Sequence, residues 1–317
     1  MRKKLLAAAG ALSAAALVLA GCSNDSGSGD GTPTVVASTN VWGAVASAVA
    51  GDKATVTSVY TSTEGDPHEF EPSAADTATI ADADILVMNG GHYDAYMEEA
   101  AKSSGATVVD AYALTRSDDH DAHDHSADDH ADHAEHDHGD ENEHVFYDLP
   151  VVAEVADKVA DALAEQDPAN AETYRANAKT FTTGIDELRG EVAGIRKAHD
   201  GTKVAQTEPL AGYLLTEAGL IDAAPAGFTQ AVEEGQSPSA ADRAAMQDLL
   251  ASRGAAVLIY NVQAVDPVTQ AMLDVAKSAK VPVVEFTETL PDGVTDYLVW
   301  QRAQVDALAA ALDAEKS

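Results

Sequence analysis

Hydrophobic residues along the chain form short runs that alternate with longer, alanine-rich segments. The runs are rich in Val, Ile and Leu and have the length of buried strands, at 34–38, 56–60, 84–88, 106–110, 203–207, 256–260 and 282–286. The segments between them have helical length, at 41–50, 73–83, 93–103, 210–218, 238–252 and 267–279. Strands alternating with helices predict an α/β fold in which mostly parallel sheets are flanked by helices on both faces. Because the alternation stops and then resumes after residue 200, we expect two similar lobes.

A long helix is predicted between the two lobes. It would begin at Asp167-Pro168, and its apolar residues recur at steps of four and three, at Tyr174, Ala178, Phe181, Ile185, Leu188, Val192 and Ile195. About thirty residues at 1.5 Å each would span roughly 45 Å. A coiled-coil dimer is the competing interpretation, but three glycines in the segment favour a single rigid helix that joins the lobes. The predicted boundaries are a first lobe at 34–166, the helix at 167–198 and a second lobe at 199–317.

The beginning of the chain has the pattern of an export signal. Three basic residues precede an apolar run at 5–20, which is too short for a transmembrane helix and closes on Leu19-Ala20-Gly21-Cys22. This pattern predicts a bacterial lipoprotein signal at 1–21, cleavage before Cys22, lipid on Cys22 and a flexible tether at 22–33. An ordinary secretory signal with a chance cysteine is the alternative. We expect a protein anchored by lipid to the outer face of the cytoplasmic membrane, and Cys22 is the only cysteine, so no disulfide can form within the chain.

The chain is strongly acidic. Its formal net charge is −34, and loss of residues 1–21, which carry three basic residues and no acidic one, would make it more negative by three charges. Such an excess argues against nucleic acid or an anionic membrane surface as a partner and is compatible with attracting cations.

One acidic segment, at 118–138, is crowded with histidine. Seven of the eleven histidines of the chain lie in it, at His120, His123, His125, His130, His133, His136 and His138. Imidazole and carboxylate groups together are ligands for zinc. The segment has no apolar periodicity, so we expect a solvated loop that collects metal weakly. An acidic linker in which histidine is incidental is the alternative.

Four further residues follow strands or loops where a selective site could form. His68 follows the second strand, His144 follows the histidine-rich loop, and Glu208 and Glu288 each follow a strand of the second lobe. The carboxyl ends of parallel strands gather ligands, so we expect these side chains to converge. Two neutral imidazoles and two carboxylates carry a formal charge of −2, which a divalent ion would neutralise.

Four blocks of sequence around these residues resemble the metal-ligand blocks of the cluster A-I (cluster 9) solute-binding proteins. The blocks are Asp66-Pro67-His68 with Glu71-Pro72-Ser73, residues 142–150, Thr207-Glu208-Pro209 with Tyr213-Leu214, and Thr287-Glu288-Thr289-Leu290. The resemblance spans residues 34–317. It implies two α/β lobes joined by one long helix, a monomeric zinc or manganese receptor for an ABC permease and its ATPase, and metal ligands at His68, His144, Glu208 and Glu288.

Two features of the sequence bear on which metal the site binds, and they point to different ions. In this family, Glu at the position of Glu208 is typical of manganese receptors, whereas zinc receptors have His there. The histidine-rich loop favours Zn²⁺, and a site of two nitrogens and two oxygens binds Zn²⁺ more tightly than Mn²⁺. We therefore expect zinc, with manganese as the alternative, and we expect Asp66, Tyr147 and Gln206 to support the ligands.

Two other classes of function remain open from the sequence. A zinc hydrolase would hold its metal with two His and a carboxylate, but His68-Glu69 lacks the second His of the metalloprotease helix motif, and neither a nucleophile elbow nor a phosphate loop is present. A surface metal buffer or adhesin is the other alternative. We expect a carrier and not an enzyme.

Overall fold

The computed structural model describes residues 31–115 and 142–315. The predicted signal sequence, Cys22, most of the predicted tether and the predicted histidine-rich loop lie outside the described residues, so these stay predictions.

The first lobe is built on a parallel sheet of four strands in the order β2-β1-β3-β4. The strands are β1 (Thr34–Thr39), β2 (Thr55–Tyr60), β3 (Ile85–Met88) and β4 (Thr107–Asp110). Val35 pairs with Val56 on one side and with Ile85 on the other, which fixes the register around the central strand β1. Every residue of β3 is buried, as expected for a strand covered on both faces.

Helices cover both faces of this sheet. On one face lie α1 (Asn40–Ala50) and α5 (Leu149–Gln166), and on the other lie α2 (Ala74–Ala81) and α3 (Ala95–Ala101), with the short α4 (Ala111–Thr115) after β4. The sequence determines where α5 begins, because the Asp148 side chain accepts a hydrogen bond from the Val151 backbone N–H and Pro150 lies in the first turn.

The second lobe repeats the arrangement, with a parallel sheet in the order β6-β5-β7-β8. Its strands are β5 (Lys203–Gln206), β6 (Ile221–Asp222), β7 (Leu258–Asn261) and β8 (Val283–Phe286). Its helices are α7 (Gly212–Glu217), α8 (Ala226–Glu233), α9 (Ala240–Ala251), α10 (Pro267–Ala279) and α11 (Tyr297–Glu315). The two sheets share one strand order, which confirms the predicted pair of similar α/β lobes.

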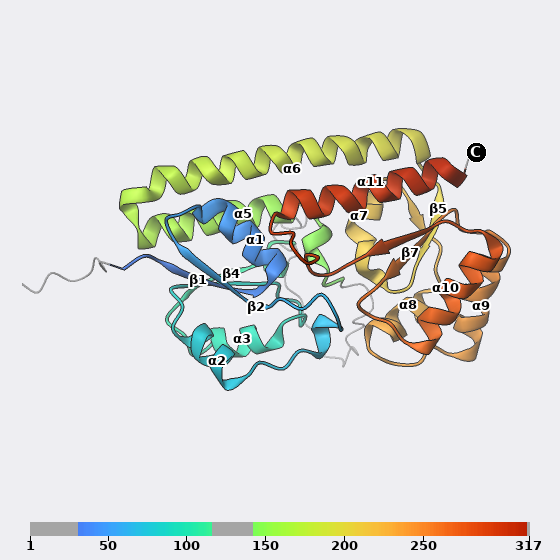
Figure 1. The fold of residues 1–317 in the computed structure, drawn as a ribbon, viewed down its shortest axis with the longest axis horizontal. Helices are drawn as coiled ribbons and strands as arrows, with labels where there is room; N and C mark the ends of the chain where they lie inside the picture. Colours follow the sequence, from blue (N-terminus) through green and yellow to red (C-terminus); the bar gives the residue numbers. More distant parts are fainter. Residues whose placement is uncertain (1–30, 116–141, 316–317) are drawn as a thin grey trace, which may run out of the picture. The chain divides into compact units, whose positions relative to one another are not determined.

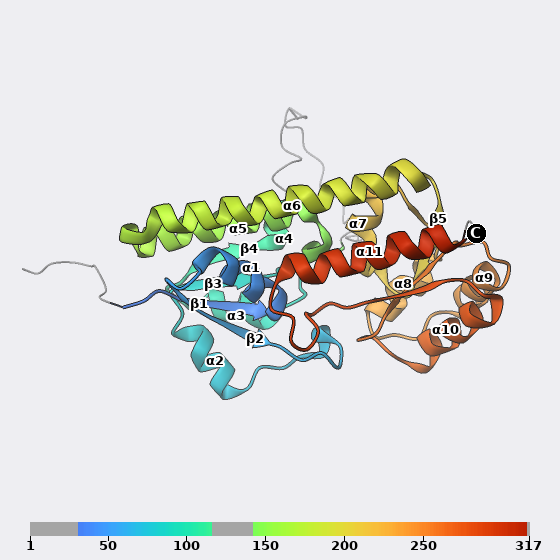
Figure 2. The ribbon, with the colours of Figure 1, turned by 45° about the horizontal axis from the view of Figure 1, so that its top comes forward.

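The predicted connecting helix is α6 (Ala171–His199), which has 29 residues. It begins slightly later than predicted, because Pro168–Asn170 forms a separate 3₁₀ turn, η4. All seven predicted apolar positions are buried. The helix packs against α5 and α1 of the first lobe and against α11 and α7 of the second. Figures 1 and 2 show α6 and α11 side by side above the sheets, with α6 reaching across both lobes.

The largest hydrophobic cluster is shared by the two lobes. A single cluster of buried residues runs from Val35 and Ile85 in the first sheet through α6 to Ile259 and Phe286 in the second. Hydrogen bonds also join the lobes: the Asn40 side-chain amide donates to the Leu290 carbonyl at 3.2 Å and accepts from the Leu290 backbone N–H at 3.0 Å. Shared packing of this kind favours a stiff connection between the lobes.

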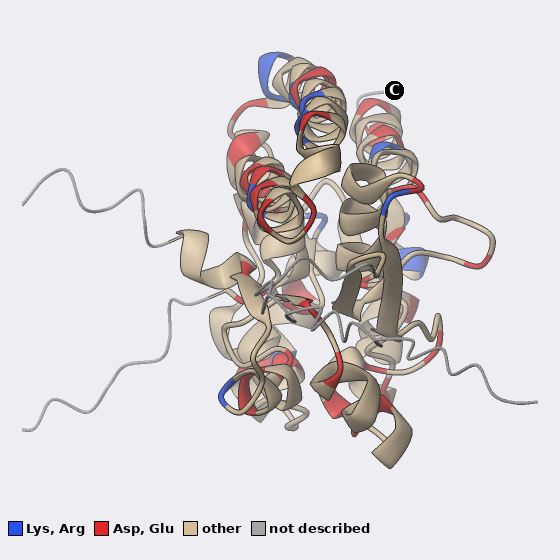
Figure 3. Cartoon of the chain, turned by 90° about the vertical axis from the view of Figure 1, so that its left-hand side faces the viewer, with Lys and Arg blue, Asp and Glu red and all other residues tan. Residues whose placement is uncertain are grey.

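In Figure 3, Asp and Glu positions recur along many helices and loops of the described chain, whereas Lys and Arg positions are few. Among the described residues, none of the helices combines the length and apolar character needed to span a membrane.

Candidate metal centre

Loops at the carboxyl ends of the strands carry the predicted ligands. His68 lies in the 3₁₀ turn η1 (Pro67–Glu69) after β2, and the Asp66 carboxylate starts that turn by accepting a hydrogen bond from the His68 backbone N–H at 2.8 Å. His144 precedes the 3₁₀ turn η3 (Val145–Tyr147), while Glu288 follows β8. The structure thus brings residues from both lobes to one place.

Three of the four predicted ligands come into direct proximity. The Glu288 Oε2 atom lies 3.4 Å from His68 Nε2 and 3.6 Å from His144 Nε2. The two imidazole rings lie 5.6 Å apart between centroids. The side chains of His144 and Glu288 are 0% and 1% exposed, whereas His68 is 17% exposed, so His68 is the most accessible of the three.

Glu208 lies next to this group and is linked to it by hydrogen bonds through a third residue, Asn261. The buried Asn261 side-chain amide, at the end of β7, donates to both the Glu208 carboxylate and the Glu288 Oε1 atom, the latter at 2.7 Å. Asn261 therefore holds the two carboxylates of the second lobe together. Whether Glu208 itself binds metal stays a prediction.

The outer nitrogen of each imidazole has a hydrogen-bond partner from the segment of the first lobe that directly precedes His144. His144 Nδ1 lies 2.9 Å from the Asn142 Oδ1 atom, which also accepts from the His144 backbone N–H, and His68 Nδ1 lies 3.2 Å from Glu143 Oε1. Oxygen acceptors at both Nδ1 atoms make those nitrogens the N–H donors. In the neutral rings, the Nε2 lone pairs then face the centre of the site, as metal ligation requires.

Several buried atoms at this centre have no hydrogen-bond partner among the described residues. They are His68 Nε2, His144 Nε2 and the Oε2 atom of a residue that the sequence analysis did not identify, Glu233. Buried polar atoms are normally satisfied, so three such atoms at one point indicate a missing partner. Two nitrogens and a carboxylate oxygen are acceptors, and the partner that suits all of them is a cation.

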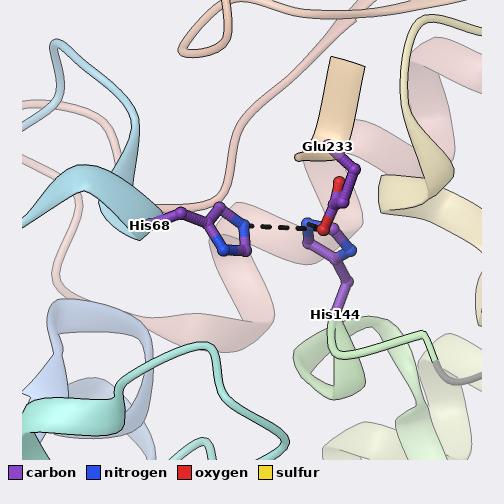
Figure 4. A group of neighbouring side chains, drawn as sticks. All are labelled: His68, His144 and Glu233. Atoms are coloured by element: carbon purple, nitrogen blue, oxygen red, sulfur yellow. Dashed lines mark ion pairs between the residues drawn. The ribbon is translucent and has the colours of Figure 1, made fainter. Parts of the chain in front are cut away.

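Glu233 is the last residue of α8 and extends into the site. Its Oε1 atom lies 3.7 Å from His68 Nε2 and 3.6 Å from His144 Nε2, and Figure 4 shows the three side chains pointing towards one another. One signal in the sequence could have identified it: Glu233 and Glu234 end a helix, where the negative end of the macrodipole disfavours acidic residues. Local choices that break such rules often mark functional positions.

The distances between these atoms fit a shared zinc ion. Ligand atoms at about 2.1 Å from a tetrahedral zinc lie about 3.4 Å from one another. The four separations between an imidazole Nε2 and the nearest oxygens of Glu233 and Glu288 range from 3.4 to 3.7 Å. A direct N–H to O hydrogen bond is shorter, at 2.7–3.2 Å. The donor set and its spacing therefore fit a divalent ion better than they fit direct ion pairs.

Crowding of charge shifts the pKa values of these groups. Burial alone would lower the pKa of His68, but the neighbouring carboxylates of Glu143 and Glu288 outweigh it and raise that pKa well above the usual value. Burial would also lower the pKa of His144, but the charges of Glu233 and Glu288 outweigh it and raise that pKa. Burial would raise the pKa of Glu288, but the two imidazoles hold it well below its usual range.

The pKa values of the other two carboxylates, Glu233 and Glu208, are raised and not lowered. Burial raises the pKa of Glu233 to about 7, against the attraction of the His144 and His68 imidazoles. Burial, followed by the charges of Glu288 and Glu233, raises the pKa of Glu208 well above its usual value. Without a metal ion, the site therefore keeps protons that a divalent cation would displace.

The three residues expected to support the ligands, Asp66, Tyr147 and Gln206, play different roles. Asp66 approaches the site, since its carboxylate lies with His68 and Glu288 in a group whose ligand atoms are all within 4.8 Å of one another. The Tyr147 hydroxyl instead donates to the Thr287 carbonyl at 2.7 Å and so holds the backbone next to Glu288. Gln206 fixes the turn after Glu208, because its Oε1 atom accepts from the Ala211 backbone N–H at 3.0 Å.

Tyr93 also supports the site, although the sequence analysis did not identify it. Its hydroxyl donates to Glu288 Oε2 at 2.9 Å, and its ring packs edge-on against His68 with 4.5 Å between centroids. Tyr93 and Asn261 thus fix the two oxygens of Glu288 from opposite lobes.

Comparison with known proteins finds similarity to metal-uptake and metal-binding proteins. The family model described as zinc-uptake complex component A, periplasmic (ZnuA) matches residues 35–311. The manganese-binding lipoprotein MntA of Halalkalibacterium halodurans is 28% identical over 184 residues, which are 55% of this chain and 54% of that protein. The chain thus aligns with about half the length of MntA. The high-affinity zinc uptake system protein ZnuA of Bacillus subtilis is 28% identical over 254 residues, which are 78% of this chain and 77% of that protein.

The fold is likewise found among solved structures. The periplasmic zinc binding protein TroA from Treponema pallidum superposes with a TM-score of 0.72 and 17% sequence identity, over 89% of this chain and 99% of that one. At this identity the likeness shows a common fold. The family match extends over most of the chain, from the first strand into the last helix, and so the chain belongs to the ZnuA family.

Proposed function

We propose that this protein is the extracytoplasmic receptor of a metal importer, anchored by lipid at Cys22. It captures one zinc ion between its lobes and delivers the ion to an ABC permease and its ATPase. The observation that carries this proposal is the convergence of His68 Nε2, His144 Nε2 and carboxylate oxygens at separations that suit a common divalent ion. The family match supports the receptor role.

Ligands from both lobes suit a carrier. We propose His68 and His144 from the first lobe and Glu208 and Glu288 from the second as the metal ligands. An ion held in this way favours the form in which the lobes are close, and the transporter must overcome that preference to release the ion. The shared cluster and α6 oppose a wide movement of the lobes.

Manganese is the second candidate for the ion. Relatives named for zinc and for manganese are both similar to this chain. The nitrogen ligands and the affinity order favour zinc, whereas the abundance of carboxylates would suit the harder ion. Purified protein exposed to equal amounts of zinc and manganese, followed by elemental analysis, distinguishes the two.

A hydrolase is the alternative from another class. Catalytic zinc sites keep one coordination position open for water. Here the Glu233 and Glu288 carboxylates, from two separate elements, both lie against the two imidazoles, which favours holding an ion over presenting a reactive water. Turnover of ester or phosphate substrates by the zinc-loaded protein would contradict the receptor role.

Calorimetric titration of metal-free protein with zinc tests the site. We expect His144→Ala to weaken binding by more than about a hundredfold, because losing a supporting partner alone costs about 10- to 100-fold. Glu208→Ala should also weaken binding strongly. The control is His92→Asn, which changes an exposed histidine and keeps a residue type that tolerates its positive φ.

Deletion of residues 118–138 tests the division between site and loop. We expect one tight zinc site to remain with nearly unchanged affinity, because a loop of scattered histidines is a weak collector and the ligands on the lobes are held rigidly. Loss of tight binding in the deletion variant, together with full affinity in Glu208→Ala and His144→Ala, would contradict the assignment.

A further inference from the structure

We propose that Glu233, at the carboxyl end of α8, is a direct ligand of the bound metal ion and determines how well the site accepts manganese. This inference rests on the proposed function and extends it to a residue outside the four ligands assigned above. The geometry that points to it is the position of the Glu233 carboxylate beside both imidazoles.

The position of Glu233 Oε1 mirrors that of Glu288 Oε2. Glu288 lies 3.4 and 3.6 Å from the two Nε2 atoms, and Glu233 lies 3.7 and 3.6 Å from the same atoms. Both oxygens are therefore placed as ligands of one ion would be. The Glu208 carboxylate is instead paired with the Asn261 amide.

Hydrogen bonding does not account for the placement of Glu233. Its Oε2 atom is buried and has no partner among the described residues, and its Oε1 distances are too long for direct bonds to the imidazoles. A carboxylate that is only 14% exposed needs a compensating positive charge. A cation at the imidazoles would supply that charge to both carboxylates at once.

The backbone around Glu233 is held in place. Phe228 and Val232 of the same helix are buried against Met246 and Leu250 of α9 in the core of the second lobe. The carboxyl end of α8, with its partial negative charge, is thereby directed to the same place as the Glu233 side chain, and both favour a cation. A ligand on a packed helix is more rigid than a ligand on a free loop.

A third carboxylate changes the preference of the site for particular ions. Two imidazoles with Glu208 and Glu288 would make four ligands, which suits zinc. Adding Glu233 provides a fifth ligand residue and more oxygen donors, which suits Mn²⁺ with its higher coordination number. Removing this carboxylate should therefore weaken manganese binding more than zinc binding.

The test uses full-length metal-free protein carrying Glu233→Gln, which keeps the size of the side chain, titrated separately with Zn²⁺ and Mn²⁺. We expect affinity to fall at least about tenfold for zinc and further for manganese, on the scale of losing a metal-site contact. Glu234→Gln is the matched control, because it makes the same change of charge at the next, exposed residue. It should retain the affinities of the unmodified protein.

Glu233→Asp separates ligation from a general effect of charge. It keeps the negative charge but withdraws the carboxylate by one methylene group. A ligand role predicts that Asp weakens binding nearly as much as Gln, whereas a long-range electrostatic role predicts that Asp preserves it. Co²⁺ provides a spectroscopic measurement: its visible absorption should intensify in Glu233→Gln as the coordination number falls from five to four.

The outcomes distinguish this inference from the proposed function. If the unmodified protein binds neither zinc nor manganese, the receptor role fails. If it binds metal tightly and Glu233→Gln shows the same affinities and the same Co²⁺ spectrum, the receptor role stands and Glu233 is not a ligand. If Glu233→Asp retains full affinity, the direct-ligand role is also overturned.

Discussion

At the scale of single residues, the site is a group of side chains that hold protons, and a metal ion can displace those protons. The pKa values of both imidazoles are raised in the metal-free protein, and the pKa of Glu233 is raised to about 7. A group with a raised pKa keeps its proton to a higher pH, and ligation requires that proton to leave. Metal binding and proton release are therefore coupled.

This coupling predicts how zinc affinity depends on pH. Zinc affinity should fall as the pH is lowered, and the fall should begin above the ordinary imidazole value of about 6.5, because both histidine pKa values are raised. Calorimetry at about pH 7 in buffers of different ionisation enthalpy should show protons released on zinc binding. Binding without proton release, and an affinity unchanged at about pH 5.5, would show that the imidazoles are not ligands.

The sequence indicated part of this site and not the rest. His68, His144 and Glu288 could be predicted because each follows a strand or a recognisable block, and the structure brings them together. Glu233 was missed because it lies on α8, which follows the two-residue strand β6. Tyr93 and Asn261 reach the carboxylates through tertiary packing, which no local pattern reveals.

At the scale of elements, hydrophobic patterning predicted most strands to within one or two residues. The apolar runs were clearest for β3 and β7, because every residue of these two strands is buried. Strand β6 escaped notice because both of its residues are exposed and it has no apolar run. The long helix was recognised from its stripe of apolar residues, and only its first turn differed, because Pro168 begins a 3₁₀ turn.

The packing of α6 against α11 gives a prediction for two glycines of this helix. A β-carbon at Gly184 would collide with the Leu298 side chain, whereas one at Gly190 would meet open space. Gly184→Val should lower the free energy of unfolding by about 1–3 kcal/mol through overpacking. Gly190→Ala should raise it by about 0.5–1 kcal/mol through helix propensity.

Chemical denaturation of the metal-free variants measures both effects. If Gly184→Val were as stable as Gly190→Ala, α6 and α11 could not be packed as closely as the structure has them.

At the scale of the whole molecule, two lobes with the same strand order present the carboxyl ends of their strands to one site. The first lobe contributes the imidazoles and the second contributes the carboxylates that lie against them. The sequence predicted this division because the alternation of strands and helices repeats after residue 200. How the ligands meet could not be predicted, because it depends on contacts between the lobes such as those of Asn40 and Asn142.

The central claim is that imidazoles of one lobe and carboxylates of the other bind one ion. Anomalous diffraction at the zinc absorption edge, from crystals of the zinc-loaded protein, tests it most directly. We predict a peak within about 2.0–2.2 Å of His68 Nε2, His144 Nε2 and an oxygen of Glu288. Zinc bound tightly elsewhere, with no peak between these three side chains, would contradict the account.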